Sequence, residues 1–556
     1  MCGTTAFLVF SRILNDILTQ IHTHSQMNSF RTLSLIVCLA IAFPAHVSTV
    51  PDENDVLHRI KNVVVLVMEN RSYDHLFGYL DLPGSDNLLN KPPFYNPVSV
   101  TDPHSPKIAT SMGAPFVAPL NPDHEANNVR QQIYGVKQNT KLEKPYPPAT
   151  MLGFVQENLY NADDHDNIAG SVMQGFNPED IAVTTTLARE FAVIDRYFCS
   201  VPGPTHPNRA FVHSATSNGD PSVDKMHMVM GFPQKTIYDS LLEKDVDWRV
   251  YFNDAPAVGL FRSMRKPTHL ARMRPWKHFW RDAMEGHLKP YSFIEPRYFD
   301  HAGLEFANDD HPPHDVRRGQ MLIKQVYETL RLSPQWNSTL LLITYDEHGG
   351  YFDHVPPPDK NVPNPDGKVS DQLDFDSLGV RVPMIAISPW IKKGLVYHRP
   401  QHGPFPTSEF EHSSIPATIK KLFNLPHFLT KRDAWAGTLD ELWTGDNALN
   451  EIRDDCPRFL PRPVPIAHAR RRRRSLPVNG TDETGSTSTS LTDMQRALVM
   501  VVRALSKDTS DVALDSAGGQ GEDGVRGMDE HQAASYVRHG MQSVWQQLGA
   551  DPKELD

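Results

Sequence analysis

Residues 63 to 78 read Val-Val-Val-Leu-Val-Met-Glu-Asn-Arg-Ser-Tyr-Asp-His-Leu-Phe-Gly, and the expected fold follows from this stretch. Residues 63–68 form a continuous apolar run with four β-branched side chains, which is typical of a strand covered on both faces. Glu69 and Asn70 follow directly and offer hard oxygen ligands. Ligands of open α/β sheets gather beyond the carboxyl ends of the strands, so the stretch predicts one wall of an active site. The alternative is a capped strand-to-helix turn, because Asn and Ser are ordinary capping residues.

Apolar runs elsewhere in the chain predict an α/β fold. Further strands are expected at residues 340–344 and 384–388, and helices at residues 178–191, 316–330 and 415–422. Strands separated by helical stretches favour a mainly parallel sheet with helices on both faces.

The composition indicates a large enzyme. With 556 residues, 39 % of them hydrophobic, the chain can bury a large core as one α/β domain with appendages, or as two or three smaller domains. The net charge of −11 disfavours general nucleic-acid binding. The 46 prolines indicate long, stiff surface loops. Four cysteines do not make a disulfide framework, and whether Cys199 and Cys456 pair stays open.

Residues 1–50 are predicted to be an N-terminal extension and a signal peptide. Arg31 precedes an apolar core at residues 33–43, which is short for a membrane span and is followed by small residues. We expect the start near Met27 and a mature protein that is secreted or lies in the endomembrane lumen, without a transmembrane span. A signal anchor is the alternative.

The C-terminal part changes in composition. Residues 463–490 are predicted to be a linker, with five consecutive arginines at 470–474 and a Gly/Ser/Thr-rich run behind them. The arginine run is most simply a solvated tether; a protease target or a contact with anionic lipid headgroups are alternatives. Residues 491–556 hold two amphipathic helix patterns, which predict a small helical cap bordering the site. A lid or lipid-contact element is the other interpretation.

The strand expected at residues 340–344 opens into two adjacent carboxylates, Asp346 and Glu347, followed by two glycines. Burying these carboxylates together with Glu69 is costly without a cation, because like charges repel in a low dielectric. The sequence therefore predicts a divalent metal, which also lowers the pKa of a coordinated hydroxyl and neutralises a phosphoryl oxygen.

Thr205 is the expected nucleophile. It lies in a Pro/Gly-rich turn between Pro204 and His206-Pro207, and metal coordination at the tip of a rigid turn activates a hydroxyl. Histidines supply donors to the phosphoryl oxygens and a general acid for the leaving alkoxide. On the residues alone an ordinary turn and ordinary loops remain alternatives, since spacing does not bring distant clusters together.

Five motifs, in order, resemble the phosphoesterase family of bacterial phospholipases C and acid phosphatases, and in particular the plant-type non-specific phospholipases C. The similarity runs from about residue 58 to residue 460, and the motifs are Glu69-Asn-Arg-Ser-Tyr-Asp-His75, Pro202-Gly-Pro-Thr-His-Pro-Asn-Arg209, Asp310-His-Pro-Pro-His-Asp315, Thr344-Tyr-Asp-Glu-His-Gly-Gly350 and Ser408-Glu-Phe-Glu-His-Ser-Ser-Ile-Pro-Ala-Thr418.

The resemblance implies an alkaline-phosphatase-like α/β/α sandwich, with residues 51–462 as the catalytic domain. It also implies hydrolysis of the glycerol–phosphate ester of phosphatidylcholine and other phospholipids at a membrane surface, giving diacylglycerol and a phosphorylated headgroup. His314 is expected to protonate the leaving oxygen. Carried over by position, the metal ligands are Glu69, Asn70, Asp346 and Glu347, the nucleophile that becomes phosphothreonine is Thr205, and the active-site histidines are His124, His314, His311 and His412.

Two other functions are compatible with these residues. The first is an acid phosphatase or phosphomonoesterase of the same fold that acts on soluble esters, for which the site residues would be the same. The second is a catalytically idle lipid- or glycan-binding protein, against which the intact ligand set argues.

Overall fold

The computed structural model describes residues 53–137, 140, 142–159, 169–222, 225–301, 305–466, 491–506 and 528–548. The predicted signal peptide, the start near Met27, the arginine run and most of the linker lie outside the described residues.

An eight-stranded sheet forms the centre, in the order β13-β6-β12-β11-β1-β10-β8-β9. Seven of its strands run in the same direction, and the eighth, β12, runs antiparallel to its neighbours β11 and β6. Its strands are β1 (Asn62–Met68), β6 (Ala192–Ile194), β8 (Trp248–Phe252), β9 (Met273–Pro275), β10 (Tyr291–Ile294), β11 (Thr339–Tyr345), β12 (Met384–Ile387) and β13 (Leu395–Tyr397).

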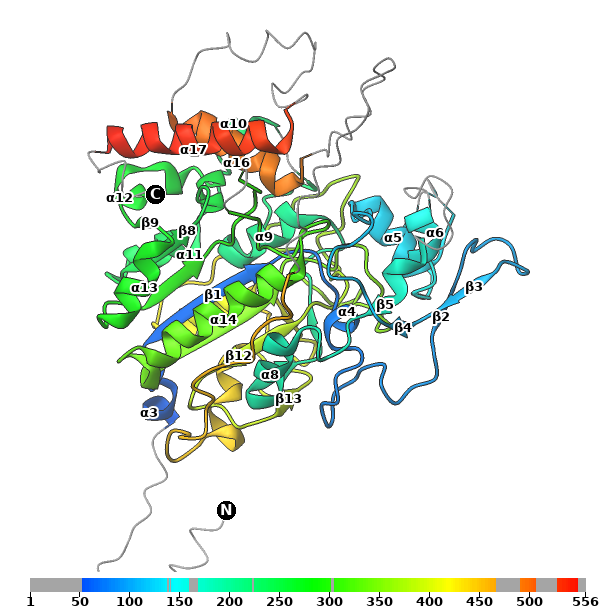
Figure 1. The fold of residues 1–556 in the computed structure, drawn as a ribbon, viewed down its shortest axis with the longest axis horizontal. Helices are drawn as coiled ribbons and strands as arrows, with labels where there is room; N and C mark the ends of the chain where they lie inside the picture. The colour runs from blue at the N-terminus through cyan, green and yellow to red at the C-terminus, as the bar shows by residue number, and fades with distance from the viewer. Residues whose placement is uncertain are drawn as a thin grey trace, which may run out of the picture. The chain divides into compact units, whose positions relative to one another are not determined.

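Helices pack on both faces of this sheet, as Figure 1 shows for α14 in front of β1. On one face α14 contacts α8 and α13, and on the other α9 contacts α11 and α15. The predicted α/β fold with a mainly parallel sheet between helices is therefore confirmed. The helices are α8 (Ala182–Glu190), α9 (Thr205–Ser214), α11 (Ile237–Leu242), α13 (Lys277–Met284), α14 (Val316–Leu332) and α15 (Ser414–Leu422).

Shorter elements surround this core. The remaining helices are α3 (Glu53–Leu57), α4 (Tyr73–Phe77), α5 (Ala126–Tyr134), α6 (Phe154–Leu159), α10 (Lys225–Met230) and α12 (Pro267–Leu270), with 3-10 turns η1 (Gly170–Met173), η2 (Ala257–Leu260), η3 (Ser263–Arg265), η4 (Trp336–Ser338), η5 (Leu439–Leu442) and η6 (Gly445–Asn447). Three two-stranded ladders pair β2 (Tyr95–Pro97) with β3 (Lys107–Ala109), β4 (Ser111–Met112) with β5 (Gln174–Gly175), and β7 (Tyr197–Phe198) with β14 (Phe410–Glu411).

Residues 63–68 form a buried strand, as their apolar composition predicts. Every residue of β1 is buried, and β1 pairs in parallel with β10 on one side and β11 on the other. A run without polar residues fits this place, because both faces of a central parallel strand are covered. Ser72 caps α4 by accepting a hydrogen bond from the His75 backbone N–H, so the alternative of a capped turn also holds, four residues after Met68, the last residue of β1.

The two predicted C-terminal helices are present as α16 (Asp493–Ser506) and α17 (Glu530–Gln547). They pack against each other, and α16 also contacts α9, α10 and η2. Their apolar faces, including Leu498, Val502, Val537 and Trp545, belong to the same core cluster as the central sheet. Removing these helices would therefore expose the main core.

Two further features bear on the expectations above. Cys199 and Cys456, the two described cysteines, are buried and free, so they do not pair with each other. Within the described part of the chain, no helix combines the length and apolar character needed to cross a membrane.

Candidate active site

The four predicted metal ligands meet at the carboxyl ends of two neighbouring strands. Met68 pairs with Tyr345 in the ladder between β1 and β11, so the residues that follow the two strands lie side by side. Asp346 Oδ1 accepts hydrogen bonds from the backbone N–H of Asn70 at 3.1 Å and of Glu347 at 2.7 Å. We call Glu69, Asn70, Asp346 and Glu347 the ligand cluster.

The backbone around the ligand cluster leaves little freedom of sequence. Asn70 has φ +60° and Gly349 has φ +64°. Asn tolerates this left-handed conformation better than most residues, and strained backbone of this kind concentrates at functional sites. A Cβ on Gly349 would lie 2.4 Å from the carbonyl oxygen of Asn70, so only glycine allows the two turns to approach this closely.

The ligand cluster holds buried oxygen atoms that have no hydrogen-bond partner among the described residues. They are Glu69 Oε1, Glu69 Oε2, Asn70 Oδ1 and Glu347 Oε1, all on fully buried residues. Burial and the carboxylates of Asp309 and Asp346 raise the pKa of Glu69 well above its usual value. Burial, together with Glu347, raises the pKa of Asp346 to about 6. Unsatisfied buried carboxylate and amide oxygens are costly, and a hard divalent cation fits them as a partner.

Arg209 brings its guanidinium to the ligand cluster. Arg209 Nε donates to Asp346 Oδ2 at 2.9 Å, and Arg209 Nη2 lies 3.4 Å from Glu69 Oε1. Arg209 is held on its other side by the Tyr298 hydroxyl, 3.1 Å from Nη1. The guanidinium thus offsets part of the negative charge while leaving the oxygens named above without hydrogen bonds.

Thr205 is the first residue of α9, one helical turn before Arg209. Residues four apart lie on the same face of a helix, so Thr205 belongs to the face that meets the ligand cluster. The turn before it is held by Asn208, whose Nδ2 donates to the carbonyls of Gly203 at 2.9 Å and Pro204 at 3.1 Å. The free N–H groups and positive dipole end of a helix N-terminus favour an anionic group beside Thr205.

His124 lies against the ligand cluster from the loop before α5. Its Nε2 lies 3.4 Å from Asn70 Nδ2 and 3.7 Å from Glu347 Oε1, while its Nδ1 donates to the Pro122 carbonyl at 2.7 Å. Burial acts to lower the pKa of His124, but Glu347 and the Pro122 carbonyl outweigh burial and raise it to about 9. The same pairing lowers the pKa of Glu347, although its burial acts the other way.

The loop that precedes α14 brings His311 and His314 to the same region. The backbone N–H of Glu69 donates to the Asp309 carbonyl at 2.8 Å, which ties this loop to the end of β1. His314 Nδ1 lies 2.6 Å from Asp309 Oδ1, and the ring of His311 is 6.1 Å from that of His124 and 6.3 Å from that of His314.

The two rings are tuned in opposite directions. Burial acts to lower the pKa of His314, but Asp309 outweighs it and holds the pKa well above its usual value. Burial and the positive charges on His124 and His314 lower the pKa of His311 well below its usual value. At neutral pH, His314 is therefore a protonated donor and His311 is neutral.

His412 contacts the backbone rather than the oxygens of the ligand cluster. Its Nε2 donates to the carbonyl of Asp346 at 2.6 Å, and burial lowers its pKa to about 4. In this geometry a neutral His412 positions Asp346.

The C-terminal helices border the site. Glu530, the first residue of α17, has its Oε1 3.7 Å from His314 Nε2, and the same oxygen accepts from the backbone N–H of Asp300 at 2.8 Å. In α16, Gln495 Nε2 donates to the carbonyl of Tyr298 at 2.7 Å. The Asp493 carbonyl lies 3.1 Å from Nε2 of His206, the neighbour of Thr205.

Three of these participants were not assigned a role from sequence: Arg209, Asp309 and Glu530. The sequence did point to Arg209, because it follows Thr205 by four residues within one motif, and this spacing puts both residues on the same face of a helix. Asp309 directly precedes another motif. For Glu530 there was no such signal, since nothing local in α17 points to His314.

A second acidic cluster lies near the ligand cluster. Asp74, Asp353 and His354 place ligand atoms within 4.8 Å of one another, the spacing expected of metal ligands. Arg381 already fills their centre, with Nη2 3.1 Å from Asp74 Oδ1 and Nε 2.9 Å from Asp353 Oδ1. We call these four residues the Arg381 cluster. Because an arginine neutralises it, the cluster needs no metal.

Comparisons with known proteins place the sequence in a family. The model of the Phosphoesterase family matches residues 60–426. Non-specific phospholipase C1 of Arabidopsis thaliana is 50 % identical over 72 % of this chain and 74 % of its own length, and non-specific phospholipase C6 of the same plant is 47 % identical over 73 % and 76 %. Non-hemolytic phospholipase C of Pseudomonas aeruginosa is 26 % identical over 75 % of this chain and 61 % of its own length.

Among solved structures, an alkaline phosphatase superfamily protein from Vibrio parahaemolyticus covers 44 % of this chain and 60 % of its own, with 12 % identity and a TM-score of 0.25. That similarity is too low to bear on function. The family match and the plant relatives carry the assignment: the chain belongs to the phosphoesterase family, together with the plant non-specific phospholipases C.

Proposed function

We propose that the protein is a phospholipase C that hydrolyses the glycerol–phosphate ester of phosphatidylcholine and other phospholipids, releasing diacylglycerol and a phosphorylated headgroup. One observation carries the chemistry: buried carboxylate and amide oxygens without hydrogen-bond partners lie beside Arg209, which follows Thr205 by one turn of α9. The substrate class is supported by the plant relatives, which are named phospholipases C.

The proposal includes a divalent metal held by Glu69, Asn70, Asp346 and Glu347. Enzymes with this fold and family generally use such metals, and the unpartnered oxygens of the ligand cluster suit one. When bound, the metal would supply positive charge for a phosphoryl oxygen and lower the pKa of a hydroxyl beside it.

Thr205 is proposed as the nucleophile that forms a phosphothreonine, which water then hydrolyses. Its place at the N-terminus of α9 aims backbone N–H groups at the phosphoryl group as charge develops there. Arg209, one turn later, holds Asp346 in position through the hydrogen bond from Nε. The rigid Asn208-bonded turn fixes where the hydroxyl points.

His314 is proposed as the general acid that protonates the departing glycerol oxygen. The Asp309 carboxylate keeps its ring protonated at neutral pH, and Glu530 faces its other nitrogen. His124, also protonated and next to Glu347, is suited to donate to a phosphoryl oxygen. His311 lies between these two rings as a neutral donor or acceptor, and His412 positions Asp346.

We further propose that the protein is exported, as a secreted enzyme or in the endomembrane lumen, and acts at a membrane surface. The apolar core at residues 33–43 behind Arg31 supports this location.

The test compares Thr205→Ala with Thr205→Ser and the wild type. Each is assayed for diacylglycerol release from phosphatidylcholine vesicles and for hydrolysis of p-nitrophenyl phosphate. We expect the alanine variant to lose turnover by at least about 10³-fold with an unchanged melting temperature, and the serine variant to keep part of it. Near-normal activity of the alanine variant would rule out the covalent route. Turnover of p-nitrophenyl phosphate without diacylglycerol release would make the protein a phosphomonoesterase instead.

A further inference from the structure

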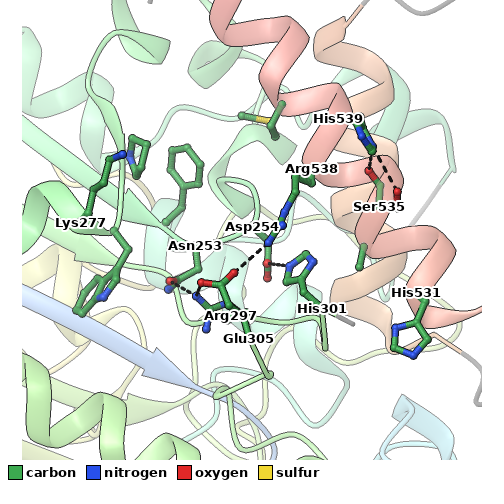
Figure 2. Close-up of a pocket in the computed structure, with 15 residues that line it drawn as sticks. Asn253, Asp254, Lys277, Arg297, His301, Glu305, His531, Ser535, Arg538 and His539 are labelled. Carbon is green, nitrogen blue, oxygen red and sulfur yellow. Dashed lines mark hydrogen bonds and ion pairs between the residues drawn. The ribbon is translucent and has the colours of Figure 1, made fainter. Parts of the chain in front are cut away.

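A second hollow lies on the same edge of the sheet as the active site, at the carboxyl ends of β8 and β9. It has a volume of about 680 Å³, within the range of ligand pockets, and none of the proposed active-site residues lines it. Phe252, Pro275 and Trp276 are its apolar lining. Residues of α17, among them Ser535 and Arg538, line another side (Figure 2). Ligands of α/β folds collect at this edge, so the hollow is a second place where one can bind.

The hollow is lined by basic side chains in a chain of net charge −11. Lys277 comes from the start of α13, Arg297 from the loop after β10, and Arg538 from α17. Two carboxylates oppose them. That of Asp254 is buried and engaged, accepting from His301 Nε2 at 2.7 Å and from the backbone N–H of Tyr298 at 2.6 Å.

Glu305 is the other carboxylate, and it occupies the place between the two arginines. Its Oε1 lies 3.1 Å from Arg297 Nη2, and its Oε2 lies 2.9 Å from Arg538 Nη2, as Figure 2 shows. The side chains of Glu305 and Arg538 are 45 % and 46 % exposed. Exposed ion pairs of this kind contribute little to stability, so an anion of higher charge can replace the Glu305 carboxylate.

We propose that this hollow binds the phosphate group of an anionic ligand between Arg297 and Arg538, with Glu305 as the internal group that the phosphate displaces. Arginine favours phosphate because its planar guanidinium donates two hydrogen bonds at once. The apolar lining accommodates the uncharged part of such a ligand beside Trp276. The phosphate comes either from an anionic lipid headgroup or from a soluble phosphate compound.

Binding there bears on the active site through α17. Arg538 and Glu530 lie on this one helix, and Glu530 faces His314 while accepting from the Asp300 N–H. A phosphate that replaces Glu305 would bridge Arg297 and Arg538 with a group of higher charge, and so would fasten α17 more firmly to the strand ends and hold Glu530 in place. The hollow is thus a ligand site and a link between the C-terminal helices and the catalytic residues.

Binding is measured with the full chain in a Thr205→Ala background, which separates the result from the outcome of the catalytic proposal. One arm is sedimentation with phosphatidylcholine vesicles with and without phosphatidic acid; the other is calorimetric titration with inorganic phosphate. Three changes are compared: Arg297→Ala with Arg538→Ala, Glu305→Gln, and Arg496→Ala. Arg496 is an exposed arginine of α16 that does not line the hollow, so it is the matched control.

We expect the double alanine variant to lose at least about tenfold in affinity in one arm or both, and Glu305→Gln to gain affinity, with Arg496→Ala unchanged. Loss in the vesicle arm identifies a lipid headgroup, and loss in the phosphate arm alone identifies a soluble compound. Unchanged binding in both arms overturns the proposal, as does an equal loss in Arg496→Ala, which would indicate diffuse charge. If the double variant does not fold, Glu305→Gln decides: a gain supports the site and no gain refutes it.

Discussion

The ligand cluster and the Arg381 cluster are built by the same two segments of chain and end in opposite electrostatic states. The segment after β1 supplies Glu69 to one and Asp74 to the other, and the segment after β11 supplies Glu347 and Asp353. In the Arg381 cluster all four carboxylate oxygens accept hydrogen bonds. In the ligand cluster both oxygens of Glu69 and one of Glu347 have none among the described residues.

The difference indicates that buried oxygens without hydrogen bonds, rather than close spacing of the ligand atoms, distinguish the proposed metal site. By spacing alone Asp74, Asp353 and His354 are the better candidate for a metal. Their carboxylates already have a cation and hydrogen-bond donors, because Arg381 provides the charge and the hydrogen bonds that a metal would provide. Glu69 has Arg209 nearby at 3.4 Å but accepts no hydrogen bond from it, so the ligand cluster stays short of positive charge.

The largest expected difference between the two clusters comes from Glu69→Gln, a change in the ligand cluster. Removing a proposed metal ligand should lower turnover of phosphatidylcholine by about 10⁴-fold, while the metal-free protein becomes no less stable because one of several crowded negative charges is gone. Vesicle assays and urea unfolding in the presence of a chelator measure the two effects.

Asp353→Asn is the mirror control, since it should lower stability and leave the activity of each folded molecule unchanged. A loss of stability in Glu69→Gln would contradict the view that crowded negative charges in the ligand cluster destabilise the metal-free protein.

Arg381→Ala tests the other side of the comparison. It removes the buried guanidinium that pairs with both Asp74 and Asp353, which should lower the free energy of unfolding by about 3–5 kcal/mol. Denaturant unfolding measures this loss. The matched control is Arg399→Ala, because Arg399 is 62 % exposed and pairs with Glu409 at 3.3 Å, so its removal should cost less than about 1 kcal/mol. Equal effects in the two variants would show that burial does not distinguish the pairs.

The sequence alone predicted the main strands and helices around the two clusters. The strands that carry them, β1 and β11, are long apolar runs, and both were predicted within one residue of their ends. The helices expected at 178–191, 316–330 and 415–422 are also present, as α8, α14 and α15. Strands of three residues such as β6 and β13 carry too little pattern to be found this way.

The contents of the clusters were harder to predict than the strands. Residue types and strand ends suggested Glu69, Asp346 and Glu347, but placing Thr205 and the histidines with them needed the resemblance to a family. Arg381 is 307 residues from its partner Asp74, and no local pattern connects them. Pairings of this kind depend on strand order, which the sequence does not state. That is also why Glu530 beside His314 was missed.

Removing metal with a chelator and then adding it back should show which cluster binds the metal, through a smaller change in the free energy of unfolding. A metal that binds only the folded state stabilises it by RT ln(1 + [metal]/Kd), about 2.7 kcal/mol at a concentration of 100 times Kd. We expect this gain in the wild type and in His354→Asn, and not in Glu69→Gln. Thermal unfolding with and without added metal measures it. Stabilisation that persists in Glu69→Gln and disappears in His354→Asn would move the metal to the Arg381 cluster.

The smallest expected effect comes from the histidine of the Arg381 cluster. Burial acts to lower the pKa of His354, but Asp74 outweighs burial, with Asp86 also contributing, and the pKa rises to about 9. The unfolded chain has a histidine pKa of about 6.5, so the protonated ring stabilises the folded state. This contribution is fully present below about pH 6.5 and is lost as the pH rises through about 9.

Urea unfolding of the wild type and of His354→Asn at pH 6 and pH 9.5 measures that contribution. The stability difference between the two proteins should be larger at pH 6, by about 2 kcal/mol, because only the wild type has an ionisable ring at position 354. The exposed partner Asp86 reduces the expected size, since water screens that side of the ring. A difference independent of pH would mean that His354 is neutral in the folded protein, and that Arg381 alone balances Asp74 and Asp353.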